Sequence, residues 1–251
     1  MLAEERFAMI LDLLAQKRSA TVLELCDALD ASESTIRRDL TQLDRQGLLK
    51  KVHGGATLVG RTVSADEPPM AAREEQSVEE KRLIARAAAA MITEKDFIFL
   101  DAGSTTLALA AALEGPALQA AYVTNGIAHA RMLVQKGCRT YLPGGQVRPI
   151  TEAITGPETL ADLQHYNFTK AFMGANGVSP AEGFTTPDPE EASIKTAALQ
   201  RARERWFLVD NTKFDMVYSA VIGDIGCGAI LTNHCPDPRY AQLTFVKECS
   251  V

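Results

Sequence analysis

Apolar residues recur at helical spacing near the start of the chain. Residues 7–14 and 22–29 each carry apolar side chains at positions i, i+3, i+4 and i+7, which puts one apolar stripe on each of two helices. Thr21 and Glu24 have the spacing of a capping box, so we expect the second helix to start at Thr21. The pattern predicts two short amphipathic helices that pack through their stripes.

A third helix is expected to follow. The hydroxyl of Ser32 can cap its first turn, and Gly47 can end it in the left-handed conformation. Ile36, Leu40 and Leu43 then face inward against the first two helices. The residues left to face mostly outward near the start of this helix are Ser34, Thr35, Arg37, Arg38 and Thr41. Such helix starts meet base edges and phosphates, and the planar guanidinium group of arginine can bind either in two places.

A short basic segment comes next. Residues 48–58 predict two strands around a Gly-Gly turn, a hairpin that would place Lys50, Lys51 and His53 beside a duplex as a wing. Between residues 33 and 61 six Lys or Arg stand against three Asp or Glu, whereas the whole chain has a net charge of −6. The basic excess is therefore local. We interpret these elements as a winged helix-turn-helix that binds DNA; the alternative is a small helical bundle with a solvated arginine face.

After residue 95 short apolar runs alternate with amphipathic segments. The expected strands are 97–100, 121–123, 140–142, 171–174, 206–209, 229–231 and 244–246. The expected helices are 77–92, 104–113, 127–135, 157–163 and 190–205, and the first of them is opened by a second capping box at Ser77 and Glu80. Continuous apolar strands alternating with helices indicate an α/β sheet covered on both faces.

The strand ends carry the unusual residues, and ligands of such sheets bind at the carboxyl ends of the strands. The strand 97–100 is followed by Asp-Ala-Gly-Ser-Thr-Thr at 101–106. Gly103 allows a close turn, unpaired N–H groups at the helix start favour an anion, and three hydroxyls add donors. The alternative is an ordinary helix start capped by Ser104. Further polar or glycine-rich strand ends are Thr124-Asn125-Gly126, Gly144-Gly145, and Asp210 with Lys213.

Residues 183–195 combine a Gly-Phe-Thr-Thr-Pro loop with the start of a helix. Glu191 and Lys195 lie four residues apart on that helix and can pair. On spacing alone we interpret them as a surface ion pair, worth roughly a few tenths of a kcal/mol. The loop in front of them makes a lid over the strand ends a second interpretation.

Composition sets the outer limits. The chain has 251 residues, 46% hydrophobic and 23% charged, which is typical of a globular protein. Its five cysteines are scattered without a Cys-x-x-Cys, so neither a disulfide framework nor a zinc site is expected. The charged start has no signal peptide, and no apolar run reaches membrane-spanning length. We therefore expect a cytoplasmic protein that needs no metal and no other cofactor.

The first part of the chain resembles the DeoR family of bacterial transcription regulators. The matching residues are Arg6, Ile10, Leu14, Ser32, Thr35, Ile36, Arg37, Arg38, Asp39 and Leu40, with Val52-His53-Gly54-Gly55-Ala56 in the wing. The resemblance implies that the third helix and the wing contact DNA. With the outward residues of the pattern, the candidate DNA-binding residues are Ser32, Ser34, Thr35, Arg37, Arg38, Thr41, Lys50, Lys51 and His53.

The rest of the chain resembles the sensor domain of the same family. The matching runs are Asp-Ala-Gly-Ser-Thr-Thr, Val-Thr-Asn, Pro-Gly-Gly, Thr-Thr-Pro-Asp-Pro-Glu-Glu-Ala-x-x-x-Lys and Leu-Val-Asp-Asn-Thr-Lys-Phe, with one departure at Asn211-Thr212, where many members have two serines. The resemblance implies a Rossmann-like domain, similar to ribose-5-phosphate isomerase and glucosamine-6-phosphate deaminase, that senses a phosphorylated sugar. The implied effector site is Asp101, Gly103, Ser104, Thr105, Thr106, Thr124, Asn125, Gly144, Gly145, Glu191, Lys195 and Lys213.

Together the patterns and the resemblance predict an α/β protein with three segments. These are a winged helix-turn-helix at 1–58, a linker at 59–76 that contains Pro68-Pro69, and a phosphosugar-sensing domain at 77–251. The expected function is repression of a sugar-catabolic operon. The repressor would be a homo-oligomer, dimer or tetramer, on double-stranded operator DNA, and a sugar phosphate would shift its DNA affinity by linkage.

The sugar and two other functions stay open at this point. Overall likeness to fructose-operon repressors makes fructose 1-phosphate the first choice of effector. One alternative is an isomerase or deaminase with Glu191 as base and Lys195 holding charge, although an enzyme has no need of a winged helix. The other is a DNA-binding protein without a ligand, against which the glycine- and hydroxyl-rich strand ends argue.

Overall fold

The chain divides into two compact units, Met1–Thr62 and Val63–Val251, here called unit 1 and unit 2. The structure is a computed structural model that describes residues 3–17, 19–46, 48–52, 54–58, 64 and 68–249. Gly47 and His53, which the sequence analysis assigned to a helix end and to the wing, lie outside the described residues, as does the side chain of Lys50.

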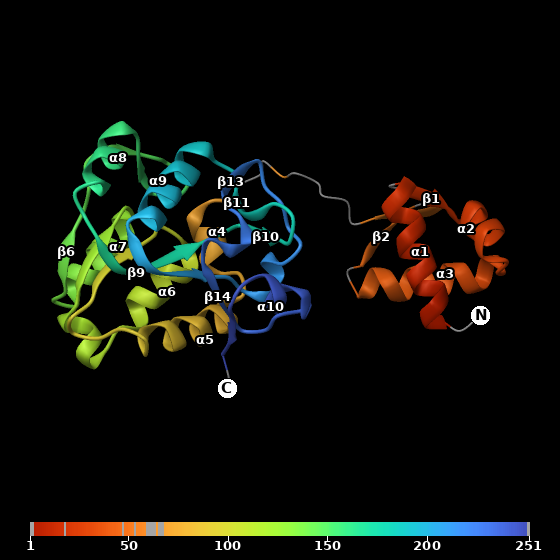
Figure 1. The fold of residues 1–251 in the computed structure, drawn as a ribbon, viewed down its shortest axis with the longest axis horizontal. Helices are drawn as coiled ribbons and strands as arrows, with labels where there is room; N and C mark the ends of the chain where they lie inside the picture. The colour runs from red at the N-terminus through yellow and green to blue at the C-terminus, as the bar shows by residue number, and fades with distance from the viewer. Residues whose placement is uncertain are drawn as a thin grey trace. The chain divides into compact units, whose positions relative to one another are not determined.

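Unit 1 has, in its described part, three helices and a three-stranded antiparallel sheet (Figure 1). The elements are α1 (Ala3–Lys17), β1 (Ser19–Thr21), α2 (Val22–Leu29), α3 (Glu33–Arg45), β2 (Leu49–Val52) and β3 (Gly55–Leu58), with the strands in the order β1-β3-β2. Thr21 caps α2 in a capping box, as predicted. β1 is a strand that the pattern did not predict. It packs so closely on β3 that a Cβ at Gly55 would lie 2.3 Å from the Ala20 carbonyl oxygen.

The predicted apolar stripes form the core of unit 1. Ile10 and Leu14 of α1, Leu25 of α2, and Ile36 and Leu40 of α3 are all at most 1% exposed. Their burial leaves the polar side of α3 to solvent, so the inward and outward faces predicted for this helix are confirmed.

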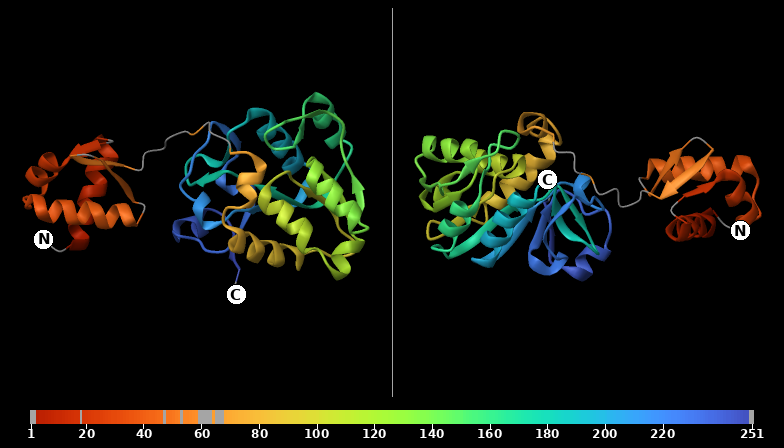
Figure 2. Two further views of the ribbon diagram at one scale, coloured as in Figure 1. Left: turned by 180° about the vertical axis from the view of Figure 1, so that it is seen from behind. Right: turned by 90° about the horizontal axis from the view of Figure 1, so that it is seen from above.

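Unit 2 is built on a seven-stranded parallel sheet. In spatial order its strands are β15 (Val246–Glu248), β14 (Ala229–Thr232), β12 (Ala202–Leu208), β9 (Phe168–Gly174), β4 (Phe97–Leu100), β5 (Ala121–Thr124) and β6 (Arg139–Tyr141). One face is covered by α5 (Val78–Ala89), α6 (Ser104–Ala112) and α7 (Ile127–Gln135), and the other by α8 (Pro157–Leu163) and α9 (Pro189–Gln200) (Figures 1 and 2). The predicted sheet with helices on both faces is confirmed.

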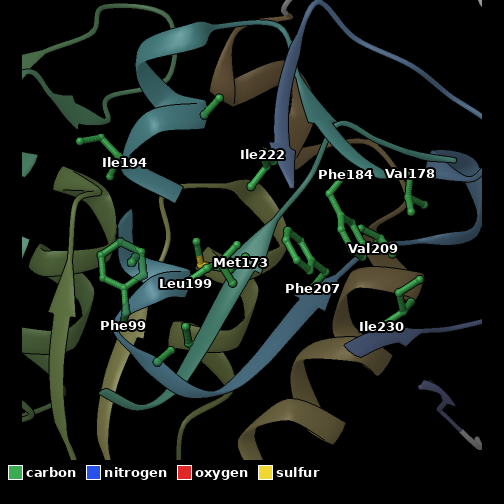
Figure 3. Close-up of a cluster of buried hydrophobic side chains, with 14 of the residues drawn as sticks. Phe99, Met173, Val178, Phe184, Ile194, Leu199, Phe207, Val209, Ile222 and Ile230 are labelled. Carbon is green, nitrogen blue, oxygen red and sulfur yellow. The ribbon is translucent and has the colours of Figure 1, made fainter. Parts of the chain in front are cut away.

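Alternate side chains of the strands fill two cores. Ile98 and Leu100 of β4 point to the side of α5 and α6, whereas Phe99 between them points to the side of α8 and α9. Figure 3 shows this second core, where Ile194 of α9 packs near Phe99 and the core continues to Phe207 of β12. Burial on both faces explains why the strands read as continuous apolar runs.

Unit 2 also contains elements that the pattern did not predict. A small antiparallel sheet is formed by β10 (Gly177–Ser179), β11 (Gly183–Thr186) and β13 (Ala220–Gly223). It is anchored on the main core because Phe184 stacks on Phe207 with ring centroids 3.5 Å apart. The remaining elements are α4 (Met70–Glu74), β7 (Gln146–Val147), β8 (Ile154–Thr155), α10 (Arg239–Leu243) and three short 3₁₀ turns, η1 (Gly115–Gln119), η2 (Asn211–Lys213) and η3 (Ile225–Cys227). α4 falls within the segment expected as linker.

Two local predictions were wrong. The helix expected at 190–205 ends at Gln200, and β12 already starts at Ala202, because its first residues pair with β9 although most of them are exposed. Ser77 does precede α5, but it has a left-handed φ of 49° and makes no side-chain cap, so the second capping box does not form. None of the helices in the described part of the chain has the length and apolar character to span a membrane.

Candidate DNA-binding and effector sites

The side chain of Ser32 caps the start of α3. The Ser32 hydroxyl accepts a hydrogen bond from the Thr35 N–H at 3.4 Å and also lies 2.8 Å from the Thr35 hydroxyl and 3.1 Å from that of Ser34. The predicted cap is therefore confirmed. Because the cap uses the hydroxyls of Ser32 and Thr35 locally, these two residues hold the helix start in shape.

Beyond the cap, α3 presents basic side chains to solvent. Arg37 is half exposed and pairs with Glu33 one turn before it, at 2.8 Å. The Arg38 side chain is exposed and, with Thr41 and Arg45, lines a groove along the helix. These arginines extend from a rigid helix, which is how recognition helices present base-reading side chains.

The first strand of the wing is bonded directly to α3. The Lys51 ammonium donates to the Thr41 hydroxyl at 2.7 Å, and the Lys51 backbone N–H donates to Asp44 at 2.9 Å. Lys51 and Thr41, both candidate DNA-binding residues, are thus brought together. Gly54 turns the hairpin with a φ of 83°, a conformation that side chains disfavour.

A partly buried ion pair on the inward side of α3 was not predicted as part of the site. Arg6 of α1 donates from two guanidinium nitrogens to the carboxylate of Asp39, which is 4% exposed. The Asp39 carboxylate raises the pKa of Arg6, chiefly through this hydrogen bonding. The pair fixes the inward side of α3 against α1. Both residues carried the family resemblance, but nothing in their spacing indicated that they meet.

The start of α6 differs from that of α3 because no side chain caps it. Gly103 is the capping residue, and Ser104 is already helical, so the alternative of a Ser104 cap is wrong. The Leu107 N–H donates to the Gly103 carbonyl at 2.8 Å, but the N–H groups of Ser104, Thr105 and Thr106 have no acceptor among the described residues. Buried N–H groups at a helix start favour an anion.

Thr106 points away from this open start. Its hydroxyl donates to the Gly103 carbonyl at 2.8 Å and lies 3.1 Å from Nε2 of His129, a buried residue of α7 that the sequence analysis did not single out. Burial lowers the pKa of His129 to about 4, so the ring is neutral at pH 7. Thr106 and His129 therefore support the loop, while Ser104 and Thr105 remain at the open side.

Asp101 and Lys195 form a buried ion pair at the end of β4. The Lys195 ammonium and the Gly174 N–H both donate to Oδ2 of Asp101, whereas the buried Oδ1 has no partner among the described residues. Burial raises the pKa of Asp101, although Lys195 opposes that rise. Oδ1 is an acceptor that a hydroxyl group of a ligand could satisfy.

Glu191 does not pair with Lys195, and neither residue is at the surface. Glu191 is 4% exposed and accepts from Arg148 and from the Thr151 hydroxyl, both at 2.5 Å. Burial would raise its pKa, but Lys195, Thr151 and Arg148 together lower it. The interpretation of a surface ion pair is therefore wrong: α9 directs two buried charges to two different partners.

The remaining predicted residues are occupied by the protein itself. The Asn125 amide accepts from the Ala102 N–H at 3.0 Å and donates to the Ile154 carbonyl at 3.3 Å. The Thr124 hydroxyl accepts from the Gly126 N–H at 3.1 Å. Thr124 and Asn125 thus brace the loop that leads into α6.

Gly144 and Gly145 lie against α8 and β8. The Gly144 N–H donates to Asp162 at 2.9 Å, and a Cβ at Gly145 would lie 2.3 Å from the Thr159 hydroxyl oxygen. The close approach that these glycines permit is therefore to their own chain, and no contact links them to the start of α6 in the described residues.

A small pocket at the open start of α6 is lined by basic side chains, most of which the sequence analysis missed. Its lining includes Gly103, Ser104 and Thr105 together with Arg73, Lys81 and Lys213, and none of the described residues that line it is acidic. Lys213 was predicted, but Arg73 of α4 and Lys81 of α5 were not. Their positions in the expected linker and in an ordinary helix carried no signal for a ligand.

Family models match both units. The DeoR-like helix-turn-helix domain matches residues 6–62, and the DeoR C-terminal sensor domain matches residues 76–232. The chain is 38% identical over 98% of its length to an uncharacterised transcriptional regulator, FruR, of Bacillus subtilis, of which the match also covers 98%. It is 35% identical to the lactose phosphotransferase system repressor of Streptococcus mutans, over 84% of this chain and 83% of that one.

Solved structures show weaker likeness. Ribose 5-phosphate isomerase A from Methanocaldococcus jannaschii matches with a TM-score of 0.41 and 15% identity over 55% of each chain, so the likeness spans about half of that enzyme. The δ subunit of eIF2B from Chaetomium thermophilum matches with a TM-score of 0.42 and 14% identity, over 74% of this chain and 57% of that one. Likeness at this level concerns the path of the chain alone.

The matched models cover both units, and the similarity to FruR runs through nearly the whole chain. A protein with a helix-turn-helix joined to a sensor domain is a regulator, which excludes the alternative of an isomerase or deaminase. The chain belongs to the DeoR family of transcriptional regulators.

Proposed function

We propose that this regulator represses a sugar-catabolic operon and that a phosphorylated sugar bound in unit 2 changes its affinity for operator DNA. The observation that carries the proposal is the pocket at the start of α6, where unpaired N–H groups meet Arg73, Lys81 and Lys213. Backbone donors and cations at one helix start favour a phosphate group. The relatives named as repressors of a lactose phosphotransferase system support a role in sugar metabolism.

In this proposal the phosphate binds at Gly103–Thr106 and the sugar extends toward Asp101. The unpartnered Oδ1 of Asp101 would accept from a sugar hydroxyl, and Lys195 would hold that carboxylate in place. Glu191 and Asn125 already have hydrogen-bond partners in the protein, so they would position the residues around the sugar rather than bind it directly. Fructose 1-phosphate is our first choice, because the likeness to FruR runs through the whole chain.

On the DNA side, we propose that Ser34, Arg37 and Arg38 of α3 contact the operator together with Lys51 of the wing. All four side chains are exposed and belong to elements that are bonded to one another. One such module contacts few base pairs, so we propose that the protein acts as a dimer or tetramer that pairs half-sites. Light scattering at micromolar concentration tests this, and a monomer both with and without operator DNA would refute it.

The decisive test of the effector site is Ser104→Asp. This change puts a negative charge at the proposed phosphate position, so we expect fructose 1-phosphate to bind at least about 100-fold more weakly in calorimetry. Operator binding should persist, but the sugar should no longer alter it. The operator can first be selected from a random DNA pool with the wild-type protein.

Ser193→Asp is the matched control. Ser193 is exposed on α9, so this substitution introduces the same charge elsewhere on unit 2. It should bind the sugar phosphate and respond to it as the wild type does. If Ser104→Asp bound fructose 1-phosphate as tightly as the control, the phosphate site would lie elsewhere. If no member of a panel of phosphosugars changed the DNA affinity of the wild type, the sensing mechanism itself would be wrong.

A further inference from the structure

Lys81 is a buried amine without a carboxylate partner. Its side chain on α5 is only 5% exposed, and its Nζ donates to the carbonyl oxygens of Arg73 and Gln76, the latter at 2.7 Å. No carboxylate oxygen lies within 4.0 Å of it among the described residues. Burial lowers the pKa of Lys81 to about 8, although the charge of Asp210 opposes that fall.

The ammonium group has a donor left for a ligand. It carries three N–H bonds, and two of them are accounted for by the two carbonyls. Lys81 also lines the pocket that contains Ser104 and Thr105, beside the unpaired N–H groups at the start of α6. An anion in this pocket would provide the missing acceptor and would add to the counter-charge that Asp210 supplies without direct contact.

The two carbonyls belong to the segment that contains α4. Arg73 is in the last turn of α4, and Gln76 follows the C-cap residue Glu75. At the other end of α4, the Met70 N–H donates to the Ile150 carbonyl at 3.1 Å, and the Met70 side chain is buried. α4 is the first helix after the boundary between the units at Thr62 and Val63.

We propose that Lys81 binds the phosphate of the effector and thereby couples occupancy of the site to the ordering of α4. The inference rests on the proposed effector site. With an anion present the ammonium form is favoured, and its hydrogen bonds to the Arg73 and Gln76 carbonyls strengthen. Without one, the charge is poorly compensated and the C-terminal end of α4 is held less firmly. The ligand thus favours the state in which α4 is docked.

Hydrogen–deuterium exchange of residues 70–76 in the full-length protein tests the coupling. Fructose 1-phosphate and inorganic phosphate are the two probes, each at a concentration that saturates binding in calorimetry. We expect either probe to slow exchange in 70–76 several-fold in the wild type. Lys81→Met should bind both probes about 10- to 100-fold more weakly, and its exchange in 70–76 should not respond even at saturation.

Arg82→Gln is the matched control, because Arg82 is the next residue on α5 and its exposed side chain pairs with Glu79. It should behave as the wild type in both measurements. If Lys81→Met does not fold, Lys81→Arg, which keeps the charge, should retain both binding and the exchange response. The exchange measurement on the wild type needs no variant and decides the coupling by itself.

The outcomes separate this inference from the proposed function. If a probe saturates the wild type and exchange in 70–76 does not change, or if Lys81→Met binds as tightly as the wild type, the role of Lys81 is refuted while the effector site stands. If neither probe binds the wild type in calorimetry, the effector site is refuted and the inference falls with it.

Discussion

The starts of α3 and α6 use the same residue types for opposite purposes. In α3 the Ser32 hydroxyl closes the first turn, and the functional groups are the exposed arginines further along the helix. In α6 the first turn is left open, and the functional groups are backbone N–H groups beside the buried Ser104 and Thr105. In the proposed function, a serine- and threonine-rich helix start therefore leads into a DNA-reading helix in one unit and offers an anion site in the other.

The position of a single glycine accounts for the difference. Ser32 occupies the capping position of α3, whereas Gly103 occupies that of α6 and has no side chain to offer. The nearest hydroxyl that could help, that of Thr106, donates to the Gly103 carbonyl and lies against His129 instead. An uncapped and buried helix start is costly to leave unsatisfied, which supports the ligand that we propose for it.

Lys195→Met should have the largest effect, because it breaks the charge pair next to the open start. Removal of the ammonium leaves Asp101 buried without its counter-ion, which we expect to lower the free energy of unfolding of unit 2 by about 3–5 kcal/mol. Urea unfolding followed by the fluorescence of Trp206, the one tryptophan of the chain, measures this unit alone.

The double variant Asp101→Asn with Lys195→Met provides the control. It removes both charges, so it should recover much of the loss seen in the single variant. A single variant as stable as the wild type would mean that the Asp101 carboxylate needs no counter-ion, and the contrast between the exposed charges of α3 and the buried charges beside α6 would lose its basis.

His129 should make unit 2 sensitive to acid. Burial holds its pKa at about 4 in the folded protein, whereas the unfolded chain binds the proton near 6.5. The unfolded state therefore gains protons first as the pH falls, and stability is lost through the window between 6.5 and 4. Between pH 7 and pH 4.5 we expect a loss of about 2–3 kcal/mol from this group.

His129→Gln separates this effect from that of the carboxylates, because glutamine does not titrate and can still pair with the Gly103 backbone. The difference in unfolding free energy between pH 7 and pH 4.5 should be smaller in the variant by that same amount. Equal pH dependence of the two proteins would show that the ring is accessible to protons, and that the loop before α6 is less enclosed than its contacts indicate.

The exposed face of α3 should affect DNA affinity without affecting folding. Arg37→Ala and Arg38→Ala should each weaken operator binding by about 1–3 kcal/mol at constant salt. The ion pair of Arg37 with Glu33 is exposed and worth only about 0.3–0.5 kcal/mol, so its loss should leave the helix intact. Fluorescence anisotropy with labelled operator DNA measures the change.

Arg131→Ala, at an exposed position on α7 of unit 2, is the control for a general loss of positive charge. It should bind the operator as the wild type does. If both α3 variants also bound like the wild type, another surface would read the DNA.

The sequence predicted what depends on local periodicity. The stripes that contain Ile10, Leu25 and Ile36 repeat every three to four residues, so the helices of unit 1 and their inward faces followed from spacing alone. In the same way the apolar strand runs of unit 2 predicted the covered parallel sheet. The limits of α9 and β12 did not follow, because pairing with β9 overrides the helical pattern of residues 202–205.

The candidate sites were predicted only where one segment carries them. The Gly103–Thr106 turn is contiguous, so it could be recognised. Arg73, Lys81 and Arg148 come from segments far away in the chain, and only the fold brings the first two to the start of α6 and the third to Glu191. For the same reason the sequence analysis paired Glu191 with Lys195 one turn away. In the structure Glu191 pairs with Arg148, and Lys195 pairs with Asp101.

The smallest expected effect concerns the Ser32 cap at the start of α3. Ser32→Ala removes the acceptor for the Thr35 N–H, so the free energy of opening of α3 should fall by about 1 kcal/mol. Ser77→Ala should change the stability of α5 by less than about 0.5 kcal/mol, because Ser77 is also a serine in the capping position of a helix but makes no cap there. Amide hydrogen exchange of the two helices, resolved by mass spectrometry, measures both.

The pair of variants tests whether the geometry of a start matters more than its sequence. Thr21 and Ser77 both stand three residues before a glutamate, yet only the capping box at Thr21 forms, and Ser77 has a left-handed backbone instead. If Ser77→Ala destabilised α5 as much as Ser32→Ala destabilises α3, residue type alone would govern a helix start. The backbone of Gly103 is extended, as at the capped start of α3, so Gly103→Ser should close the open start of α6 and weaken phosphate binding in calorimetry.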